Sequence, residues 1–195
     1  MTSVNIKKLL KNTVSLLLTL LIMSSILDFI RKPTVPDNLN ATALYDLQGN
    51  PFFLPQLDQD KPTVLYFWGT WCSYCRYTSS AINDLAKEGY PVVSVALRSG
   101  SAQDVANYLM EHQYGFTTVN DPQGELATQW DVGVTPSIII LRHGKMDLAT
   151  TGWTSYWGLK VRLKNTVNFY RTFISVRGMI PFHFVPFLFH KRIQL

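Results

Sequence analysis

The chain is poor in the side chains that build metal centres and disulfide networks. Only two of its 195 residues are cysteine and four are histidine, and the histidines (His112, His143, His183 and His190) show no spacing that would bring them together. A tetrahedral zinc site needs four ligands, so this composition does not support one. The sequence also lacks internal repeats and low-complexity segments. A chain of this length therefore corresponds to one domain with appendages.

Acidic residues are absent after Asp147. The chain carries 18 basic and 13 acidic side chains, a net charge of +5, with a pI near 9.2. Seven of the basic side chains follow Asp147, so residues 1–147 hold 11 basic against 13 acidic side chains, a net charge of −2. Basicity confined to a tail does not indicate nucleic-acid binding, and we expect no nucleic-acid partner.

The tail itself, residues 165–195, mixes phenylalanine with arginine and lysine. This composition suits a membrane surface. Two arginines and two prolines within the tail (Arg171, Arg177, Pro181 and Pro186) disfavour a second membrane span. We favour the plainer interpretation, a basic aromatic extension without an evolved role.

An apolar run from Thr13 to Leu27 follows three lysines and precedes further charged residues. This is the layout of an export signal. Cleavage would need small residues just beyond the run, whereas Ser24-Ser25 lies inside it, so we expect an uncleaved anchor; a cleaved signal and a buried core helix are the alternatives. The preceding lysines place the amino terminus in the cytoplasm. Residues 1–31 are thus predicted to be a cytoplasmic stub and a single-pass inner-membrane anchor, with a periplasmic domain behind the proline-containing linker 32–40.

Residues 41–164 show the alternation of strands and helices typical of an α/β domain. The order predicts a mixed sheet with helices on both faces. The first helix should turn Tyr77, Ala81, Ile82 and Leu85 to one side, and Asp121-Pro122 should begin a short helix as its cap and first residue. The expected strands are two short ones around Gly49-Asn50, then 62–68, 90–98, 137–141 and 146–151; the expected helices cover 72–87, the residues after Ser101, the residues after Asp121, and 155–164.

Both cysteines lie in the stretch "YFWGTWCSYCRYTS", at the junction between a buried strand and a helix. Free N–H groups and the helix dipole should lower the pKa of the Cys72 thiol from about 8.5 into a range near 3.5 to 7.5. Cys75 is one turn later on the same face, about 5 to 6 Å away, a spacing that suits a disulfide. A nucleophile and a resolving thiol are the parts that disulfide exchange needs. Two alternatives stay open: a two-thiolate copper(I) site, and a structural disulfide, although so short a loop would stabilise little.

The segment "VLYFWGTWCSYC", with "GVTPSIIIL" about sixty residues later, resembles the thioredoxin superfamily. Together with the anchor, it is similar to the membrane-tethered TlpA-like branch, and within it to the suppressor of copper sensitivity protein D (ScsD) group. The resemblance covers about residues 41–164 and implies a thioredoxin-like fold. It also implies that Cys72 is the attacking thiolate and Cys75 the resolving thiol.

The resemblance assigns supporting roles around the cysteines. Thr135-Pro136 would be the family's cis-proline pair, packed against the disulfide and offering backbone groups to a substrate chain. Trp71 would shield the pair. Ser73-Tyr74, between the cysteines, has no histidine to stabilise a thiolate, which weakens the case for a strongly oxidising enzyme.

Two positions depart from the family pattern. Tyr66 stands where thioredoxin has an acidic residue that serves proton transfer, and Thr78 stands where some TlpA-like reductases have a glutamate. Proton handling should therefore fall to water or to Tyr66.

The sequence thus predicts a periplasmic, membrane-anchored protein-disulfide oxidoreductase that exchanges disulfides with exported proteins. We expect no cofactor beyond the redox-active disulfide Cys72–Cys75. We also expect no metal ligands in that function. A membrane electron-transfer protein should regenerate the pair. The competing interpretation is a copper(I)-binding protein for metal tolerance that uses the same two thiolates, and an inert scaffold is a third.

Overall fold

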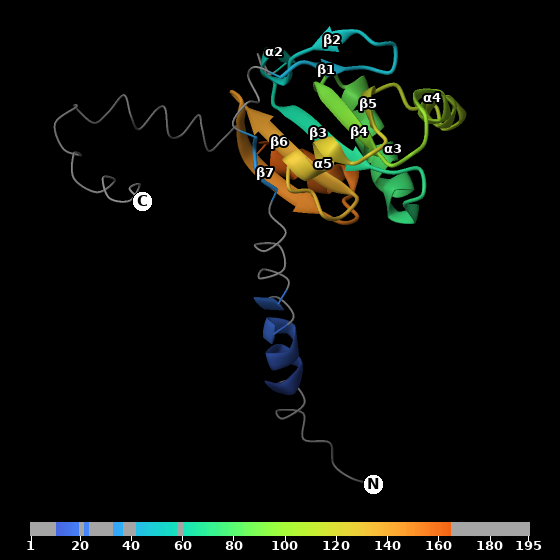
Figure 1. Cartoon of the computed structure of the whole chain (residues 1–195). Helices are drawn as coiled ribbons and strands as arrows, with labels where there is room; N and C mark the ends of the chain where they lie inside the picture. The colour runs from blue at the N-terminus through green and yellow to red at the C-terminus, as the bar shows by residue number, and fades with distance from the viewer. Residues whose placement is uncertain (1–10, 20–21, 24–32, 37–41, 58–60, 165–195) are drawn as a thin grey trace, which may run out of the picture.

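The computed structural model describes residues 11–19, 22–23, 33–36, 42–57 and 61–164. Between residues 42 and 164 the chain forms one α/β domain (Figure 1). The elements follow in the order β1 (Leu44–Tyr45), β2 (Pro51–Phe52), α2 (Leu54–Leu57), β3 (Thr63–Trp68), α3 (Ser73–Lys87), β4 (Val92–Leu97), α4 (Ala102–Glu111), β5 (Thr117–Asp121), α5 (Glu125–Gln129), β6 (Ser137–Arg142) and β7 (Lys145–Thr151). Residues 156–164 are again helical.

The main sheet has five strands in the order β5-β4-β3-β6-β7, with β3 in the centre. β3, β4 and β5 are parallel, whereas β6 and β7 run antiparallel, which makes the sheet mixed as predicted. Phe67 near the end of β3 pairs with Ser137 at the start of β6. The residues that follow β3 and those that precede β6 therefore meet at the same end of the sheet.

Alternate residues of the buried central strand supply two separate cores. Tyr66 and Trp68 belong to the core under α3, α4 and the helix 156–164, whereas Leu65 and Phe67 face the core under α2 and α5. This two-sided covering explains why the sequence of β3 is a continuous apolar run rather than an alternating one. The prediction of a sheet with helices on both faces is confirmed.

Three details differ from the sequence-based expectations. Tyr77 is exposed, because the inward face of α3 passes through Cys75, Thr78, Ala81 and Ile82 instead. The short helix α5 begins at Glu125 with Gly124 as its cap. Asp121 ends β5, and its carboxylate still accepts the N–H groups of Leu126 and Ala127. β5 itself was not predicted, because "TTVND" is short and polar.

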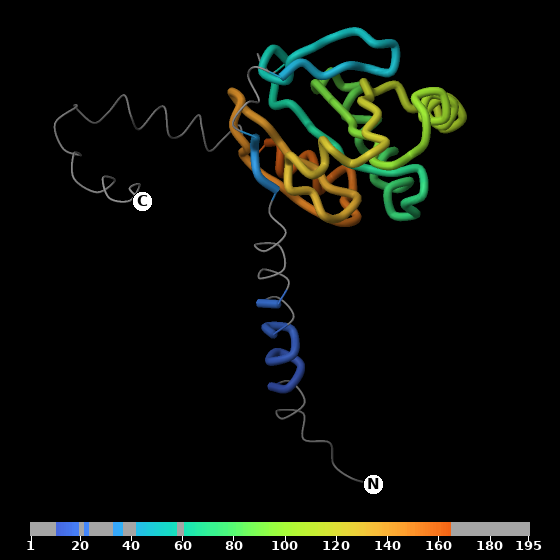
Figure 2. The backbone as a smooth tube through the Cα atoms, in the orientation of Figure 1, coloured from blue at the N-terminus to red at the C-terminus, as the bar shows by residue number. Residues whose placement is uncertain are grey.

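Residues 33–36 of the predicted linker lie on the domain. The Thr34 N–H donates to the Trp130 carbonyl at 3.0 Å, Pro33 is buried, and Val35 packs against the core of the α5 face. Figure 2 traces this segment, in blue, to the side of the domain. The four residues are therefore a docked part of the domain rather than a free tether, and the remainder of the predicted linker, like the tail 165–195, falls outside the described residues.

The predicted anchor, residues 1–31, also lies partly outside the described residues. Residues 11–19 and 22–23 are helical, with exposed apolar side chains such as Leu17 and Ile22. Among the residues that the structure describes, no helix is long and apolar enough to cross a membrane.

The last helix is joined to the end of α3 by one carboxylate. Glu88, the C-cap of α3, accepts hydrogen bonds from the Lys160 ammonium and the Tyr156 hydroxyl. The Lys61 ammonium donates to the Glu88 carbonyl at 2.8 Å, and Lys160 lies 5.3 Å from the centre of the Tyr90 ring. The bonds from Lys160, and then from Tyr156, lower the pKa of Glu88 below its usual value of 4.5. The junction is thus a charge-assisted cluster at the surface.

We expect Glu88→Gln to remove a pH-dependent part of the stability. Because the folded-state pKa is lowered, the contribution of Glu88 is present above pH 4.5 and is lost as the pH falls through the folded-state pKa. Urea unfolding at several pH values should show that the wild type exceeds the variant near pH 6 and that the gap closes in acid. Glu111→Gln, at the exposed end of α4, is the matched loss of one carboxylate. Identical pH dependence of the two variants would contradict the assignment.

Candidate active site

Cys72 and Cys75 form a disulfide at the amino-terminal end of α3. Their Cα atoms are 5.2 Å apart, within the range that the sequence predicts. Cys72 is the N-cap of the helix, and its Sγ accepts the N–H of Cys75 at 3.2 Å. Cys72 is 8% exposed and Cys75 only 1%. An incoming sulfur therefore reaches Cys72 first, and Cys75 lies behind it.

The loop between β3 and α3 is shaped by a glycine and an indole. The Trp71 ring lies so close to Gly69 that a Cβ there would come within 2.6 Å of it, so the position excludes a side chain unless the ring moves. The Trp71 Nε1–H donates to the Leu97 carbonyl at 3.1 Å. The indole is thus held toward the end of β4, a placement that the predicted shielding role did not include.

A second contact holds the same loop from the residues just after β4. The Thr70 N–H donates to Ser99 Oγ at 3.0 Å, and that hydroxyl donates to the Leu97 carbonyl at 3.1 Å. Ser99 is buried. Sequence reasoning did not single it out, because a lone serine after a strand carries no pattern that identifies a partner so far along the chain.

The Thr135–Pro136 peptide bond is cis, as the family resemblance implied. Pro136 is buried, and Ser137 immediately after it begins β6 beside the end of β3. The Pro136 carbonyl accepts the N–H of Gly152 at 2.8 Å, which joins the end of β7 to this loop. The fold therefore brings Thr135 and Pro136 to the same end of the sheet as the disulfide.

Ser73 and Tyr74, between the cysteines, form the first turn of α3 and are both exposed. Their side chains lie on the solvent side of the helix, whereas Cys75 and Thr78 face inward. The predicted pair thus forms part of the surface around Cys72.

Tyr66 on β3 lies beneath the first turns of α3. Its hydroxyl donates to the Cys75 carbonyl at 3.2 Å and is 2.9 Å from Ser79 Oγ. Burial raises the pKa of the phenol far above its usual value of 10.0. Tyr66 therefore remains neutral near pH 7 and links the central strand to the helix by hydrogen bonds. The fully buried Thr78 donates to the Tyr74 carbonyl at 3.4 Å.

No group of three or more Cys, His, Asp and Glu side chains suited to a metal ion occurs within the described part of the chain. Once the disulfide is reduced, the site would offer a metal ion two thiols, which are soft donors.

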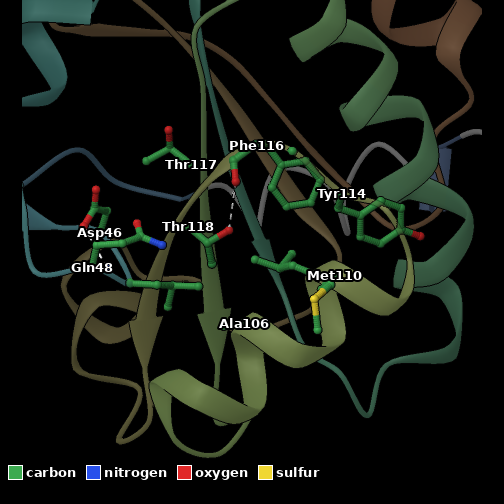
Figure 3. A pocket seen from close by; sticks show the side chains of 11 residues that line it. Asp46, Gln48, Ala106, Met110, Tyr114, Phe116, Thr117 and Thr118 are labelled. Atoms are coloured by element: carbon green, nitrogen blue, oxygen red, sulfur yellow. Dashed lines mark hydrogen bonds between the residues drawn. The ribbon is translucent and has the colours of Figure 1, made fainter.

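A pocket of about 390 Å³ has none of the predicted site residues in its lining. Figure 3 shows its walls from close by. The pocket is bounded by the turn after β1, the second half of α4 and the start of β5, with Gln48, Met110 and Thr117 among its walls. Because β5 is parallel to β3, its first residues lie at the opposite end of the sheet from Cys72. Within the pocket wall, the Thr118 hydroxyl donates a hydrogen bond to the Phe116 carbonyl.

Comparison with known proteins identifies the family to which the chain belongs. Residues 34–148 match the AhpC/TSA family. A thioredoxin-like protein of Haemophilus influenzae is 67% identical over 158 residues, which cover 81% of this chain and 95% of that protein. The thiol-disulfide oxidoreductase ResA of Bacillus subtilis is 25% identical over 131 residues, 64% of this chain and 72% of the relative.

Solved structures share the fold. A secreted disulfide oxidoreductase of Mycobacterium tuberculosis, described as homologous to DsbE of E. coli, superposes with a TM-score of 0.56 at 24% identity and covers 66% of this chain and 98% of its own. The predicted thioredoxin-like α/β fold is confirmed. This chain belongs to the AhpC/TSA family and is a thioredoxin-like oxidoreductase whose Cys-x-x-Cys pair forms a disulfide.

Proposed function

We propose that the protein exchanges disulfides with exported proteins through Cys72 and Cys75, from an anchor in the bacterial inner membrane. The observation that carries this proposal is the Cys72–Cys75 disulfide at the start of α3, with Cys72 as the helix cap and the more exposed sulfur. The amino-terminal N–H groups and the helix dipole favour a thiolate at that position once the bond is reduced.

In the reducing direction, the Cys72 thiolate attacks one sulfur of a client disulfide. A bond forms between Cys72 Sγ and that sulfur, and the other client sulfur leaves as a thiolate. Cys75 then loses its proton and attacks Cys72 Sγ, which breaks the mixed disulfide and releases the second client thiolate. The client gains two electrons, and the Cys72–Cys75 bond is restored. The oxidising direction is the reverse sequence.

The neighbouring residues support these steps. The loop at Thr135 and Pro136 offers backbone groups to the client chain at the end of the sheet where Cys72 lies. Trp71, Ser73 and Tyr74 surround Cys72 and contact the client on its way to the sulfur. A membrane electron-transfer protein acts on the same surface to reset the pair, because each round of exchange changes its redox state.

Of the two routes for the Cys75 proton, solvent is the better one. Tyr66 would have to be a phenolate to accept it, and burial raises the pKa of this phenol. Its hydroxyl instead donates to the Cys75 carbonyl and holds the first turn of α3. We therefore assign Tyr66 a positioning role.

The location rests on the amino terminus and on relatives. The helical residues 11–19 carry exposed leucines, which suits an anchor, and the related oxidoreductase of M. tuberculosis is a secreted protein. The finer placement in the TlpA-like branch, close to the ScsD group, is part of this proposal. The alternative function is copper(I) binding by the same two thiolates.

Cys75→Ala should trap clients. Without the resolving thiol, the mixed disulfide at Cys72 persists, so acid-quenched and alkylated cells producing the full chain should show high-mass adducts on non-reducing gels. Cys72→Ala and the double variant are the matched controls and should show none. Adducts that depend on Cys75 rather than Cys72 would contradict the assigned roles. One-to-one copper(I) retention by the wild type without any exchange would favour the copper interpretation instead.

Tyr66→Phe should change stability more than pH dependence. Removing the hydroxyl leaves the buried Ser79 without this partner, at a cost of about 1 to 3 kcal/mol in the free energy of unfolding. Resolution of a preformed mixed disulfide, measured by stopped flow between pH 6 and 9, should keep the wild-type pH profile, since the phenol stays neutral there.

The double variant Tyr66→Phe with Ser79→Ala is the control, because removing both hydroxyls should recover part of the lost stability. A titration present in the wild type and missing from Tyr66→Phe would show that the phenol does exchange protons.

Leu17→Lys should weaken membrane attachment. A lysine within the apolar run costs about 2.5 to 3.5 kcal/mol of insertion free energy if it lies near the helix centre. Alkaline extraction of membranes should leave the wild-type full chain in the pellet and release part of the variant. Met110→Lys, at an exposed position of α4, should behave as the wild type. A wild-type chain found shortened in the soluble periplasmic fraction would show a cleaved signal.

A further inference from the structure

Large aromatic side chains are exposed on the segments that lie near the disulfide end of the sheet. Trp71 is 58% exposed, Tyr74 69%, Tyr77 68% and Trp153 64%. Trp71 is held by its hydrogen bond to Leu97. Tyr77 and Trp153 have no such role in the fold described above, and neither belongs to the Cys-x-x-Cys or cis-proline motifs.

Tyr77 lies on the second turn of α3, and Trp153 lies just after β7. Tyr77 is five residues after Cys72, about 7.5 Å along the axis of α3 at 1.5 Å per residue. Trp153 follows Gly152, whose N–H donates to the Pro136 carbonyl, and β7 ends at Thr151 opposite Ser137. Tyr77 therefore extends the exposed aromatic surface along α3, and Trp153 extends it beyond the cis-proline loop.

Exposure at Tyr77 is not a by-product of packing. The buried face of α3 is built from Cys75, Thr78, Ala81 and Ile82, and Tyr77 adds nothing to it. A polar residue would serve the fold at this solvent-exposed position equally well. Exposed apolar surface of this kind marks interaction sites, in which tyrosine and tryptophan are enriched.

The chemistry at Cys72 determines what lies on this surface. In a mixed disulfide the client sulfur is about 2.0 Å from Cys72 Sγ, and because that sulfur is only 8% exposed, the client chain must approach closely. An extended chain advances about 3.3 Å per residue. Client residues two and three positions from the cysteine then lie about 7 to 10 Å away, the distance at which Tyr77 lies along α3.

We propose that Tyr77 and Trp153 select client segments that carry large apolar side chains on both sides of the reacting cysteine. The inference rests on the proposed function, since it assigns a substrate class to the same site. Such segments are those of unfolded or partly folded polypeptides, because folded proteins bury most of their large apolar residues.

Two synthetic peptides test the selection. Each has nine residues and one central cysteine in a mixed disulfide with thionitrobenzoate; one carries Leu and Phe at the second and third positions on either side, the other Ser and Gly. The Cys72 thiolate of the reduced full chain attacks the peptide sulfur, joins it, and expels thionitrobenzoate, a good leaving group with a low pKa. Stopped-flow absorbance gives the second-order rate constant for each peptide.

The apolar peptide should react about 5- to 30-fold faster than the polar one, the range expected when an aromatic anchor is lost or gained. Tyr77→Ala and Trp153→Ala should each lower the rate with the apolar peptide toward that of the polar peptide. Their rates with the polar peptide and with 2-hydroxyethyl disulfide should stay within about twofold of the wild type, which also shows that the variants fold.

Tyr45→Ala and Trp157→Ala are the matched controls. Tyr45 is also exposed, at 57%, but lies on β1. Trp157 packs against Tyr156, whose hydroxyl bonds to Glu88 at the far end of α3. Both controls should leave every rate unchanged. Equal rates for the two peptides, or a control that matches Tyr77→Ala, would overturn the inference. Failure of the wild type to react with any of the three disulfides would instead overturn the proposed exchange function.

Discussion

The bond between the Cys75 N–H and Cys72 Sγ is the contact on which the site depends. It makes a sulfur the cap of α3, where serine, threonine or aspartate usually satisfies the free N–H groups. The position of that cap is set by β3, whose residues are all buried in the centre of the sheet. The sheet and the helix are joined again by Tyr66, which bonds to the Cys75 carbonyl. The Cys72 sulfur is thus placed at the end of the buried central strand.

Neighbouring strands hold the same turn from both sides. At the end of β4, the Leu97 carbonyl binds the indole of Trp71, and Ser99, two residues after the strand, binds the N–H of Thr70. From the other side, β6 begins beside the end of β3 and brings Pro136 with it. The difference in exposure between the two sulfurs follows from this arrangement, because Cys72 lies at the edge of the turn while Cys75 faces the core. The packing therefore leaves Cys72 the more accessible sulfur, and this adds to the effect of the helix terminus, which favours a thiolate at the same position.

Most of the site could be predicted from sequence because its parts are local. The apolar run of β3, the helix after it and the Cys-x-x-Cys spacing lie within about twenty-five residues of one another, and the cis bond before Pro136 came from family resemblance. What could not be predicted depends on contacts across the sheet. Ser99 has no distinguishing neighbours in sequence, and β5 is a short edge strand whose polar residues give no periodic signal. The residue type of Tyr77 predicts that it lies on the apolar side of α3, whereas the helix turns the smaller Thr78 inward.

Tyr66 occupies the position at which thioredoxin has an acidic residue, and this difference has an electrostatic consequence. A carboxylate at this position of the core would carry a desolvation cost and, when ionised, would repel a second negative charge on the nearby thiolate. The phenol of Tyr66 stays neutral because burial raises its pKa, and its hydroxyl is satisfied by Ser79 and the Cys75 carbonyl. Position 66 therefore adds no charge that opposes ionisation of Cys72. The helix terminus can stabilise the thiolate without competition from the strand beneath it, and the strand contributes rigidity instead.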